Sequence, residues 1–312
     1  MTNGDETRTI RIATRASKLA LWQAEYVRGL LIEQSPGTRV ELVEVISTGD
    51  AVRDRPLFEV GGVGIFTKEV QEAVLDGRAD LAVHSLKDLP TLSPKELILA
   101  AVPKRASPND VLLAPRHRVL ERLPRDARVA TSSLRRRAQL LRLRPDLQIV
   151  DIRGNVETRI RKLHEQELDG LILARAGIDR LGLEGEITEE LPIETMLPAV
   201  GQGALGIECR ADDRTILDLL SRLEDRGTRA SVEAERSFLR VIEGGCQVPA
   251  GGFGTVIDDL LHLRGRVLDE TGAHCCEGSI EGTPAEAVSL GAKLAQHLLS
   301  EGAGSFLRRR RV

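Results

Sequence analysis

The sequence predicts an α/β protein of two lobes followed by a smaller α+β C-terminal domain. Two successive stretches, 9–84 and 128–176, alternate strand, helix and strand, which is typical of mainly parallel sheets covered by helices. The stretch 205–208 is apolar and predicts a further strand that returns the chain to the first lobe. After Thr228 a helix precedes Gly-rich turns and alternating strands, and this change of pattern predicts the third part.

Hydrophobic periodicity predicts each element in order. Alternating or continuous apolar runs predict strands, and apolar residues on one face behind a capping Ser or Thr predict helices. In the first lobe we expect strands at 9–14, 38–46 and 81–84 and helices at 17–33 and from Thr67. In the second lobe we expect strands at 128–131, 147–152 and 170–176 and helices from Ser133 and at 156–166. In the last part we expect helices at 231–242 and 285–299 and strands at 254–257 and 261–268.

The return of the chain implies that the first domain is discontinuous. We expect domain 1 to comprise 1–103 plus about 202–223, domain 2 to comprise 108–198 and domain 3 to comprise 226–312. In open sheets with parallel strands, ligands bind beyond the carboxyl ends of the strands, where helices begin. Candidate site residues should therefore follow strands directly.

Composition narrows the class of protein. The net charge of −3 disfavours a dedicated nucleic-acid binder, and the arginines cluster inside the chain, which indicates fixed sites for anions. No stretch approaches the ~20 apolar residues of a membrane helix, and the first residues resemble neither a signal nor a transit peptide. The four cysteines lack paired spacing, which indicates reduced thiols. We expect a cytoplasmic protein with no membrane or nucleic-acid partner.

Three predicted helix starts carry arginine. Arg15 and Ser17 follow the first strand, 131–137 (Thr-Ser-Ser-Leu-Arg-Arg-Arg) follows another, and 153–159 (Arg-Gly-Asn-Val-Glu-Thr-Arg) follows a third. Free N–H groups at a helix start favour a carboxylate or phosphate, and guanidinium groups add charge-assisted bonds. Simple helix capping with exposed arginines is the alternative at any one site. Together the three sites imply a ligand with many negative charges.

The loop 84–90 (His-Ser-Leu-Lys-Asp-Leu-Pro) ends a predicted buried strand. A Ser/His/Asp triad is disfavoured, because three residues of one short loop lack the geometry that links base and nucleophile. Asp88 is better explained as an isolated carboxylate in a cationic cleft, kept ionised by nearby Arg and Lys, where it can stabilise a developing cation. A loop salt bridge of Lys87 with some acid is the alternative.

Glycine and cysteine motifs complete the set. The stretch 61–66 (Gly-Gly-Val-Gly-Ile-Phe) lacks dinucleotide-binding spacing and predicts a flexible loop beside a cleft. His274, Cys275 and Cys276 have no second pair of spaced ligands, so no metal site is expected. Cys246 follows a glycine, and an accessible thiol there is compatible with nucleophilic catalysis, covalent attachment or no function.

Two of these motifs are highly specific: the loop 84–90 and the run 243–249 (Glu-Gly-Gly-Cys-Gln-Val-Pro). With them, and from about residue 10 to about residue 300, the sequence resembles the porphobilinogen deaminase family. The other stretches that carry the resemblance are 11–17, 19–23, 79–83, 131–136, 153–159, 174–182 and 197–210.

The resemblance implies both fold and reaction. It implies two lobes of the type II periplasmic-binding-protein topology and a third domain that bears the cofactor cysteine. Four molecules of porphobilinogen, a small-molecule substrate, would be deaminated and joined head to tail into hydroxymethylbilane. The chain would grow on a dipyrromethane cofactor bound to Cys246 through a thioether, and hydrolysis would release the product.

The resemblance also implies roles for individual residues. Asp88 matches the catalytic aspartate, and Phe66 keeps its place in the substrate loop. Residues that match the binding of the cofactor carboxylates are Arg15, Ser17, Ser85, Lys87, Thr131, Ser132, Ser133, Arg135, Arg136, Arg153, Gly154, Arg159 and Arg180. The chain departs from many members at Glu59 and Val63, where they carry lysines, so any anion contact of those lysines is in doubt here.

Three rival functions are compatible with parts of the sequence. Two arginine-lined lobes could form an organic-anion-binding module, although Cys246 and the third domain count against it. Nucleic-acid binding through 135–137 and 308–311 is disfavoured by the net charge and the scarcity of aromatic residues. A thiol enzyme with Cys246 as transient nucleophile lacks an obvious His base.

Overall fold

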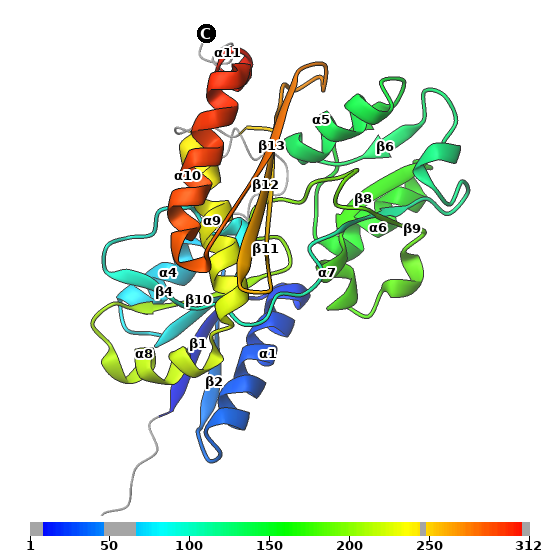
Figure 1. The fold of residues 1–312 in the computed structure, drawn as a ribbon. Helices are drawn as coiled ribbons and strands as arrows, with labels where there is room; N and C mark the ends of the chain where they lie inside the picture. The colour runs from blue at the N-terminus through cyan, green and yellow to red at the C-terminus, as the bar shows by residue number, and fades with distance from the viewer. Residues whose placement is uncertain (1–8, 47–66, 244–247, 308–312) are drawn as a thin grey trace, which may run out of the picture. The chain divides into compact units, whose positions relative to one another are not determined.

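The computed structural model of the chain describes residues 9–46, 67–243 and 248–307. It divides into two compact units, Met1–Arg105 with Ala204–Asp225, and Ala106–Gly203 with Arg226–Val312 (Figure 1). Phe66, Cys246, Glu59 and Val63 lie outside the described residues.

The first unit is built on one five-stranded sheet in the order β2-β1-β3-β10-β4. β1 is parallel to β2 and β3, whereas β10 is antiparallel to β3 and β4. The predicted return of the chain to the first lobe is thus confirmed by β10. The strands are β1 (Ile10–Arg15), β2 (Val40–Val45), β3 (Leu81–Ser85), β4 (Leu97–Ala101) and β10 (Leu205–Arg210), and the helices are α1 (Lys18–Gln34), α4 (Lys68–Leu75) and α8 (Arg214–Leu220).

Strand alternation gives this sheet two buried faces. Ile12 of β1 packs in one core with α1 and α8, whereas its neighbour Ala13 packs in a second core with α4. Polar side chains follow the same alternation: Glu208 of β10 points to the α4 face, where it meets Gln71. This arrangement brings β1, β3, α1 and the α4 face together at the carboxyl ends of β1 and β3.

The second unit contains a sheet of the same topology. Its order is β7-β6-β8-β5-β9, with β8 parallel to β6 and antiparallel to β5. The prediction that β8 is buried is confirmed, but the sheet is mixed rather than parallel. The strands are β5 (Asp110–Leu113), β6 (Arg128–Ala130), β7 (Gln148–Val150), β8 (Gly170–Ala174) and β9 (Glu189–Leu191), and the helices are α5 (Leu134–Leu143), α6 (Val156–Glu165) and α7 (Arg175–Asp179).

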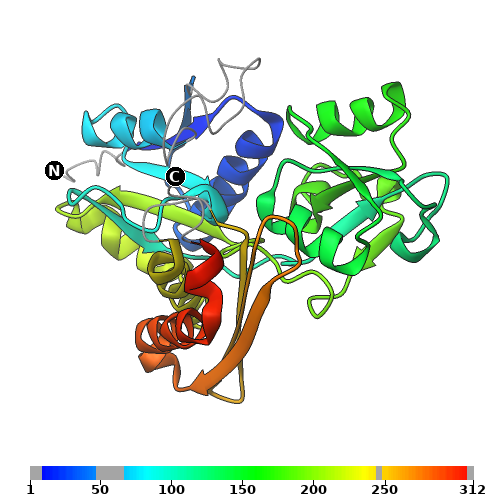
Figure 2. The same cartoon turned by 90° about the horizontal axis from the view of Figure 1, so that it is seen from above.

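The rest of the second unit is the predicted smaller α+β domain. Three antiparallel strands, β11 (Ala250–Ile257), β12 (Leu260–Leu268) and β13 (Cys275–Gly282), form its sheet. The helices α9 (Arg226–Glu243) and α10 (Ala287–Leu298) lie side by side against it (Figures 1 and 2). They approach so closely that a Cβ on Gly291 would lie 2.1 Å from the Ala234 carbonyl oxygen. Two equivalent sheets and this domain confirm the predicted fold class.

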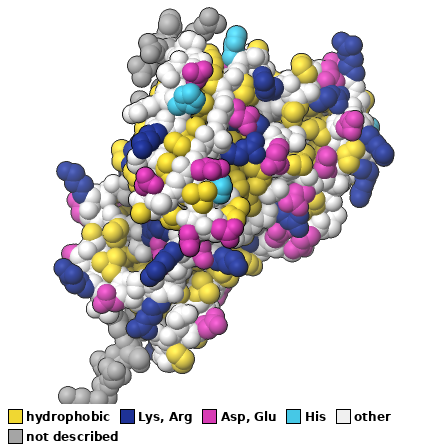
Figure 3. All heavy atoms as spheres, in the orientation of Figure 1, with side chains coloured by type: hydrophobic (Ala, Val, Ile, Leu, Met, Phe, Trp, Pro, Cys, Tyr) yellow, Lys and Arg dark blue, Asp and Glu magenta, His cyan; other side chains and the backbone are white. Residues whose placement is uncertain are grey.

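Short helical turns complete the described chain. They are η1 (Leu86–Asp88), η2 (Leu120–Arg122), η3 (Glu184–Glu186), η4 (Ser221–Leu223), η5 (Pro284–Glu286), η6 (Leu299–Ala303) and α11 (Gly304–Leu307). No helix of the described residues is long and apolar enough to cross a membrane. On the face that Figure 3 displays, cationic and acidic side chains are interspersed.

Candidate active site

A small cavity of about 60 Å³ in the first unit brings four predicted site residues together. Arg15 and Ser17 lie where β1 passes into α1, and Ser85 and Asp88 lie where β3 ends. Because β1 and β3 are parallel neighbours, their carboxyl ends meet at one edge of the sheet. The structure therefore places these four predicted residues directly after strands and around one cavity.

The Asp88 carboxylate is presented by a short anchored turn. Leu86 and Leu89 are buried beneath η1, while Lys87 and Asp88 are exposed. Gly206 of β10 lets this turn lie close, since a Cβ there would be 2.8 Å from Leu86. Within the described residues, Asp88 makes no ion pair or hydrogen bond of its own, so its oxygens are available to a ligand.

Two polar side chains of α1 and its cap, Ser17 and Gln23, line the cavity. Ser17 caps this helix, its Oγ accepting from the Ala20 amide at 3.3 Å, as the capping alternative predicted. Gln23 is 3% exposed and donates through Nε2 to Ser85 Oγ at 2.7 Å. Gln23 was not singled out as a site residue. A polar residue among Ala24, Val27 and Leu31 on the buried face of α1 was the available signal.

His84, which lines the same cavity, forms a buried pair with Glu208. His84 Nε2 lies 3.2 Å from Glu208 Oε2, and the Glu208 oxygens accept from Gln71 Nε2 at 2.8 Å and Ser93 Oγ at 2.7 Å. Burial alone would raise the pKa of Glu208, but the nearby His84 imidazole and the two neutral donors hold that pKa below its ordinary value. His84 thus faces Glu208 rather than Ser85, in line with the rejection of a Ser/His/Asp triad.

The second unit holds the next arginine site at the start of α5. Ser133 caps this helix, accepting from the Arg136 amide at 3.4 Å, and Thr131 Oγ1 accepts from the Ser133 amide at 3.2 Å. Ser132 Oγ donates to the Ile152 carbonyl oxygen and accepts from the Ile152 amide. All three hydroxyls are therefore used to shape the turn between β6 and α5.

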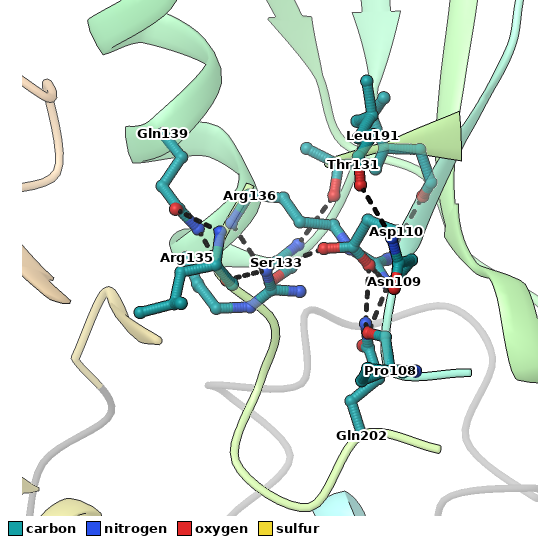
Figure 4. A network of polar contacts seen from close by, with 12 residues as sticks. Pro108, Asn109, Asp110, Thr131, Ser133, Arg135, Arg136, Gln139, Leu191 and Gln202 are labelled. Carbon is teal, nitrogen blue, oxygen red and sulfur yellow. Dashed lines mark hydrogen bonds and ion pairs between the residues drawn. The ribbon is translucent and has the colours of Figure 1, made fainter. Parts of the chain in front are cut away.

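Arg135 and Arg136 converge on one buried acid, Asp110 (Figure 4). Asp110 Oδ2 accepts from Arg135 Nη1 at 2.7 Å, and Oδ1 accepts from Arg136 Nε at 3.0 Å and Nη2 at 2.7 Å. Burial by itself would raise the pKa of Asp110, but the two guanidinium charges hold it far below its ordinary value. Asp110 was not among the predicted site residues, although an acid at the start of an apolar stretch is a usable signal in the sequence.

The third arginine site lies between β7 and α6. Gly154 has a φ of +119°, and a Cβ there would lie 2.6 Å from Thr158 Cγ2, so this turn requires glycine. Asn155 caps α6 by accepting from the Thr158 amide at 2.8 Å. Arg153 and Arg159 flank this turn and are partly buried. Arg180 lies beyond α7 and donates through Nη2 to the Gly203 carbonyl oxygen at 2.8 Å.

Comparison with known proteins assigns the family. The family model described as "Porphobilinogen deaminase, dipyromethane cofactor binding domain" matches residues 10–218, and the porphobilinogen deaminase C-terminal domain matches 230–300. The chain belongs to the porphobilinogen deaminase family. Curated relatives of that name come from Syntrophotalea carbinolica (48% identical, covering 96% of this chain and 95% of the relative) and Nitratidesulfovibrio vulgaris strain Miyazaki F (50%, covering 95% of each). A third, from Pelotomaculum thermopropionicum, is 47% identical over 97% of each chain.

Membership of the porphobilinogen deaminase family defines the chemistry in outline. The protein is a transferase of tetrapyrrole synthesis with a small-molecule substrate, and its cofactor is dipyrromethane. This finding supports the enzyme over the organic-anion-binding module.

Burial raises the thiol pKa of each cysteine in the described part of the chain. Cys209 is buried, and burial raises its pKa to about 12. Burial also raises the pKa of Cys275 and of Cys276, which lie on β13. Thiolate reactivity falls as the thiol pKa rises. In the described part of the chain, no group of His, Cys, Asp and Glu side chains could hold a metal ion.

Proposed function

We propose that Asp88 is the catalytic carboxylate of a reaction in which four porphobilinogen molecules are joined head to tail into hydroxymethylbilane with release of ammonia. The observation that carries this proposal is the cavity in which Asp88 lies with Arg15, Ser17 and Ser85. An unpaired carboxylate beside a cationic side chain suits a substrate that carries both negative carboxylates and a developing positive charge.

The chain's own residues fit the dipyrromethane cofactor. Each pyrrole ring of the cofactor and substrate carries an acetate and a propionate, and arginine is the side chain best suited to bind carboxylates. The residues proposed to bind these groups are Arg15, Ser17, Ser85 and Lys87 in the first unit and Thr131, Ser132, Ser133, Arg135, Arg136, Arg153, Gly154, Arg159 and Arg180 in the second. When bound through a thioether to Cys246, dipyrromethane supplies the pyrrole carbon on which the product grows.

Asp88 would act on each incoming porphobilinogen. Breaking the C–N bond of the aminomethyl group releases ammonia with the bonding electrons and leaves a methylene-pyrrolenine whose positive charge extends onto the ring nitrogen. The Asp88 carboxylate can accept a hydrogen bond from that N–H and stabilise the charge. Preorganised electrostatic groups of this kind typically contribute about 10²–10³ in rate.

The proposal extends to the organisation of the protein. We propose the three domains 1–103 plus about 202–223, 108–198 and 226–312, with Phe66 in a loop that contacts substrate. We also propose that the enzyme is cytoplasmic and monomeric. The reducing cytoplasm would protect the Cys246 thiol from oxidation before the cofactor is attached.

Intact mass and ammonia release test the proposed function together. The purified protein should carry an adduct of two pyrrole units that is lost in Cys246→Ser. Asp88→Ala should keep the adduct but release ammonia from porphobilinogen at least about a hundredfold more slowly, because the stabilising carboxylate is gone. Asp76→Ala, which removes an exposed acid of the same unit, serves as the control and should release ammonia at the native rate. Active protein with an unmodified mass would contradict the proposal.

A further inference from the structure

The first turn of α5 places two positive charges where a helix disfavours them. Arg135 and Arg136 directly follow the first helical residue, Leu134, and the helix dipole is positive at this end. Their guanidinium groups point inward, and the residues are only 5% and 6% exposed. Burying charge costs stability unless it is paired. A site of this kind therefore needs a compensating anion.

Asp110 supplies part of that compensation. It lies at the start of β5 on the face that α5 covers, and it is 0% exposed. Each of its oxygens is committed to a different arginine, and Oδ1 also accepts from Gln202 Nε2 at 2.9 Å. One carboxylate thus fixes the directions of two guanidinium planes (Figure 4). Gln202 Nε2 also donates to the Pro108 carbonyl oxygen at 2.6 Å, and this bond fixes the Gln202 amide beside Asp110.

The compensation is incomplete. Two guanidinium groups against one carboxylate leave one positive charge, and in the described residues neither arginine pairs with another acid. Arg135 Nε is buried and has no hydrogen-bond partner among the described residues. An excess charge and an unsatisfied N–H in the same group both indicate that an anionic ligand completes the cluster.

Neutral contacts fix Arg135 further. Its Nη1 also donates to the Leu197 carbonyl oxygen at 2.7 Å, the same oxygen that accepts from Gln139 Nε2 at 3.0 Å. Gln139 Oε1 accepts from Arg266 Nη1 of β12 at 2.7 Å. The guanidinium is therefore held from two sides, by Asp110 and by the Leu197 carbonyl.

We infer that Asp110 is a positioning residue of the enzyme: it aligns Arg135 and Arg136 and leaves their cluster with a single positive charge, which binds one carboxylate of the cofactor or the growing chain. This inference rests on the proposed function, which makes the two arginines carboxylate ligands. Asp110 touches neither cofactor nor substrate and acts through the arginines.

Two substitutions separate geometry from charge. Asp110→Asn removes the charge and turns an amide N–H₂ toward one guanidinium. Asp110→Glu keeps the charge but moves the carboxylate by one methylene. Asp146→Asn is the matched control, because Asp146 pairs with Arg144, the C-cap of the same helix, at 2.6 Å without lying in the cluster. Gln202→Met keeps the Asp110 charge but removes the hydrogen bond to Asp110 together with the bonds of Gln202 to the Pro108 carbonyl oxygen and Arg136. It provides a milder variant if both Asp110 variants fail to fold.

Kinetics of the cofactor-loaded fraction of each variant, identified by intact mass, test the inference. Both Asp110 variants should lose about tenfold or more in kcat/KM for porphobilinogen, chiefly through KM, since displaced ligands cost binding. Gln202→Met should raise KM about threefold, because it removes a hydrogen bond that orients the Asp110 carboxylate without removing its charge. Asp146→Asn should match the native protein.

A purely structural role predicts a different pattern. Variants that melt at lower temperature but show native kcat and KM once loaded would overturn the inference, as would native KM in Gln202→Met when the Asp110 variants do not fold. The native protein is measured in parallel. If it lacks the adduct or does not consume porphobilinogen, the proposed function fails; if it has both, a negative result concerns Asp110 alone.

Discussion

Two buried carboxylates, Glu208 in the first unit and Asp110 in the second, are each surrounded by side chains that compensate their charge. In the first unit the Glu208 carboxylate faces His84 and two neutral donors, and in the second the Asp110 carboxylate faces two arginines. Both acids are 0% exposed. A buried ion pair adds little net stability, but removal of one partner leaves an uncompensated charge. Such pairs therefore specify the orientation of side chains more than they stabilise the fold.

Glu208→Gln tests how much the ionised Glu208 carboxylate contributes to the stability of the first unit. The folded pKa of Glu208 lies below its ordinary value, so its ionisation contributes stability above about pH 4.3 that is lost as pH falls through the lowered pKa. Substitution should cost about 1–3 kcal/mol at pH 7 and flatten the decline of melting temperature between pH 5 and pH 3. Thermal melting across that range, with the exposed Glu25→Gln as control, measures both effects. Equal pH profiles for the two variants would argue against a buried, ionised Glu208.

Local sequence patterns located the residues that end strands but not their buried partners. Asp88, Arg15, Ser17 and Ser85 each lie in a motif that can be recognised over a few positions, and the structure brings them to one cavity. Asp110 and Glu208 act through partners on other elements. The sequence pattern of β5 or β10 does not predict which side chain a single acid will contact. That contact depends on the register of the strands and on which face of the sheet the acid occupies.

At the scale of elements, capping and periodicity predicted most helices and strands of the lobes. β13 was missed because its residues, 275–282, carry no continuous apolar face and alternate between partial burial and exposure. α9 begins at Arg226, earlier than the expected 231, because tertiary contacts extend a helix beyond the segment of clear amphipathic pattern. β5 was not predicted from the sequence, because it is short and begins with a buried acid.

Gly154 determines how α6 begins. In Gly154→Ala the left-handed φ and the contact of the new Cβ with Thr158 should together destabilise the protein by about 1–3 kcal/mol. Displacement of Arg153 and Arg159 should also raise KM for porphobilinogen. Melting temperature and steady-state kinetics measure the two effects. Gly185→Ala is the matched control, since nothing lies within 4 Å of its Cβ and its φ is ordinary; a similar loss in both variants would contradict the steric explanation.

At the scale of the whole molecule, the two lobes repeat one topology. Each sheet places an antiparallel strand between its third and last strands: β10 in the first unit and β5 in the second. The sequence predicted the returning strand β10 from its apolar run but not its counterpart β5. The repeat means that each unit presents helix starts at the ends of parallel strands, and both units carry arginine there.

Loss of the cofactor should therefore lower the melting temperature of the whole protein. If Cys246 carries the cofactor as proposed, Cys246→Ala protein is unloaded and retains the arginines without the carboxylates proposed to bind them. Charge-assisted bonds are worth about 1.5–3 kcal/mol each. A ligand that binds only the folded state raises the melting temperature. With about 2–4 °C per kcal/mol for a chain of this kind, two such bonds should lower the melting temperature of the unloaded variant by about 6 °C or more.

Scanning calorimetry of loaded native protein, Cys246→Ala and Cys275→Ala distinguishes this effect from the loss of a thiol. Cys275→Ala should keep the adduct and melt near the native temperature, since Cys275 is partly buried on β13 and far in sequence from the cofactor motif. Inorganic phosphate should raise the melting temperature of Cys246→Ala more than that of the loaded protein, because phosphate can bind the arginines that carboxylates otherwise engage. Equal melting of the two cysteine variants, or an equal response to phosphate, would show that the arginines of this enzyme are balanced within the chain rather than by its cofactor.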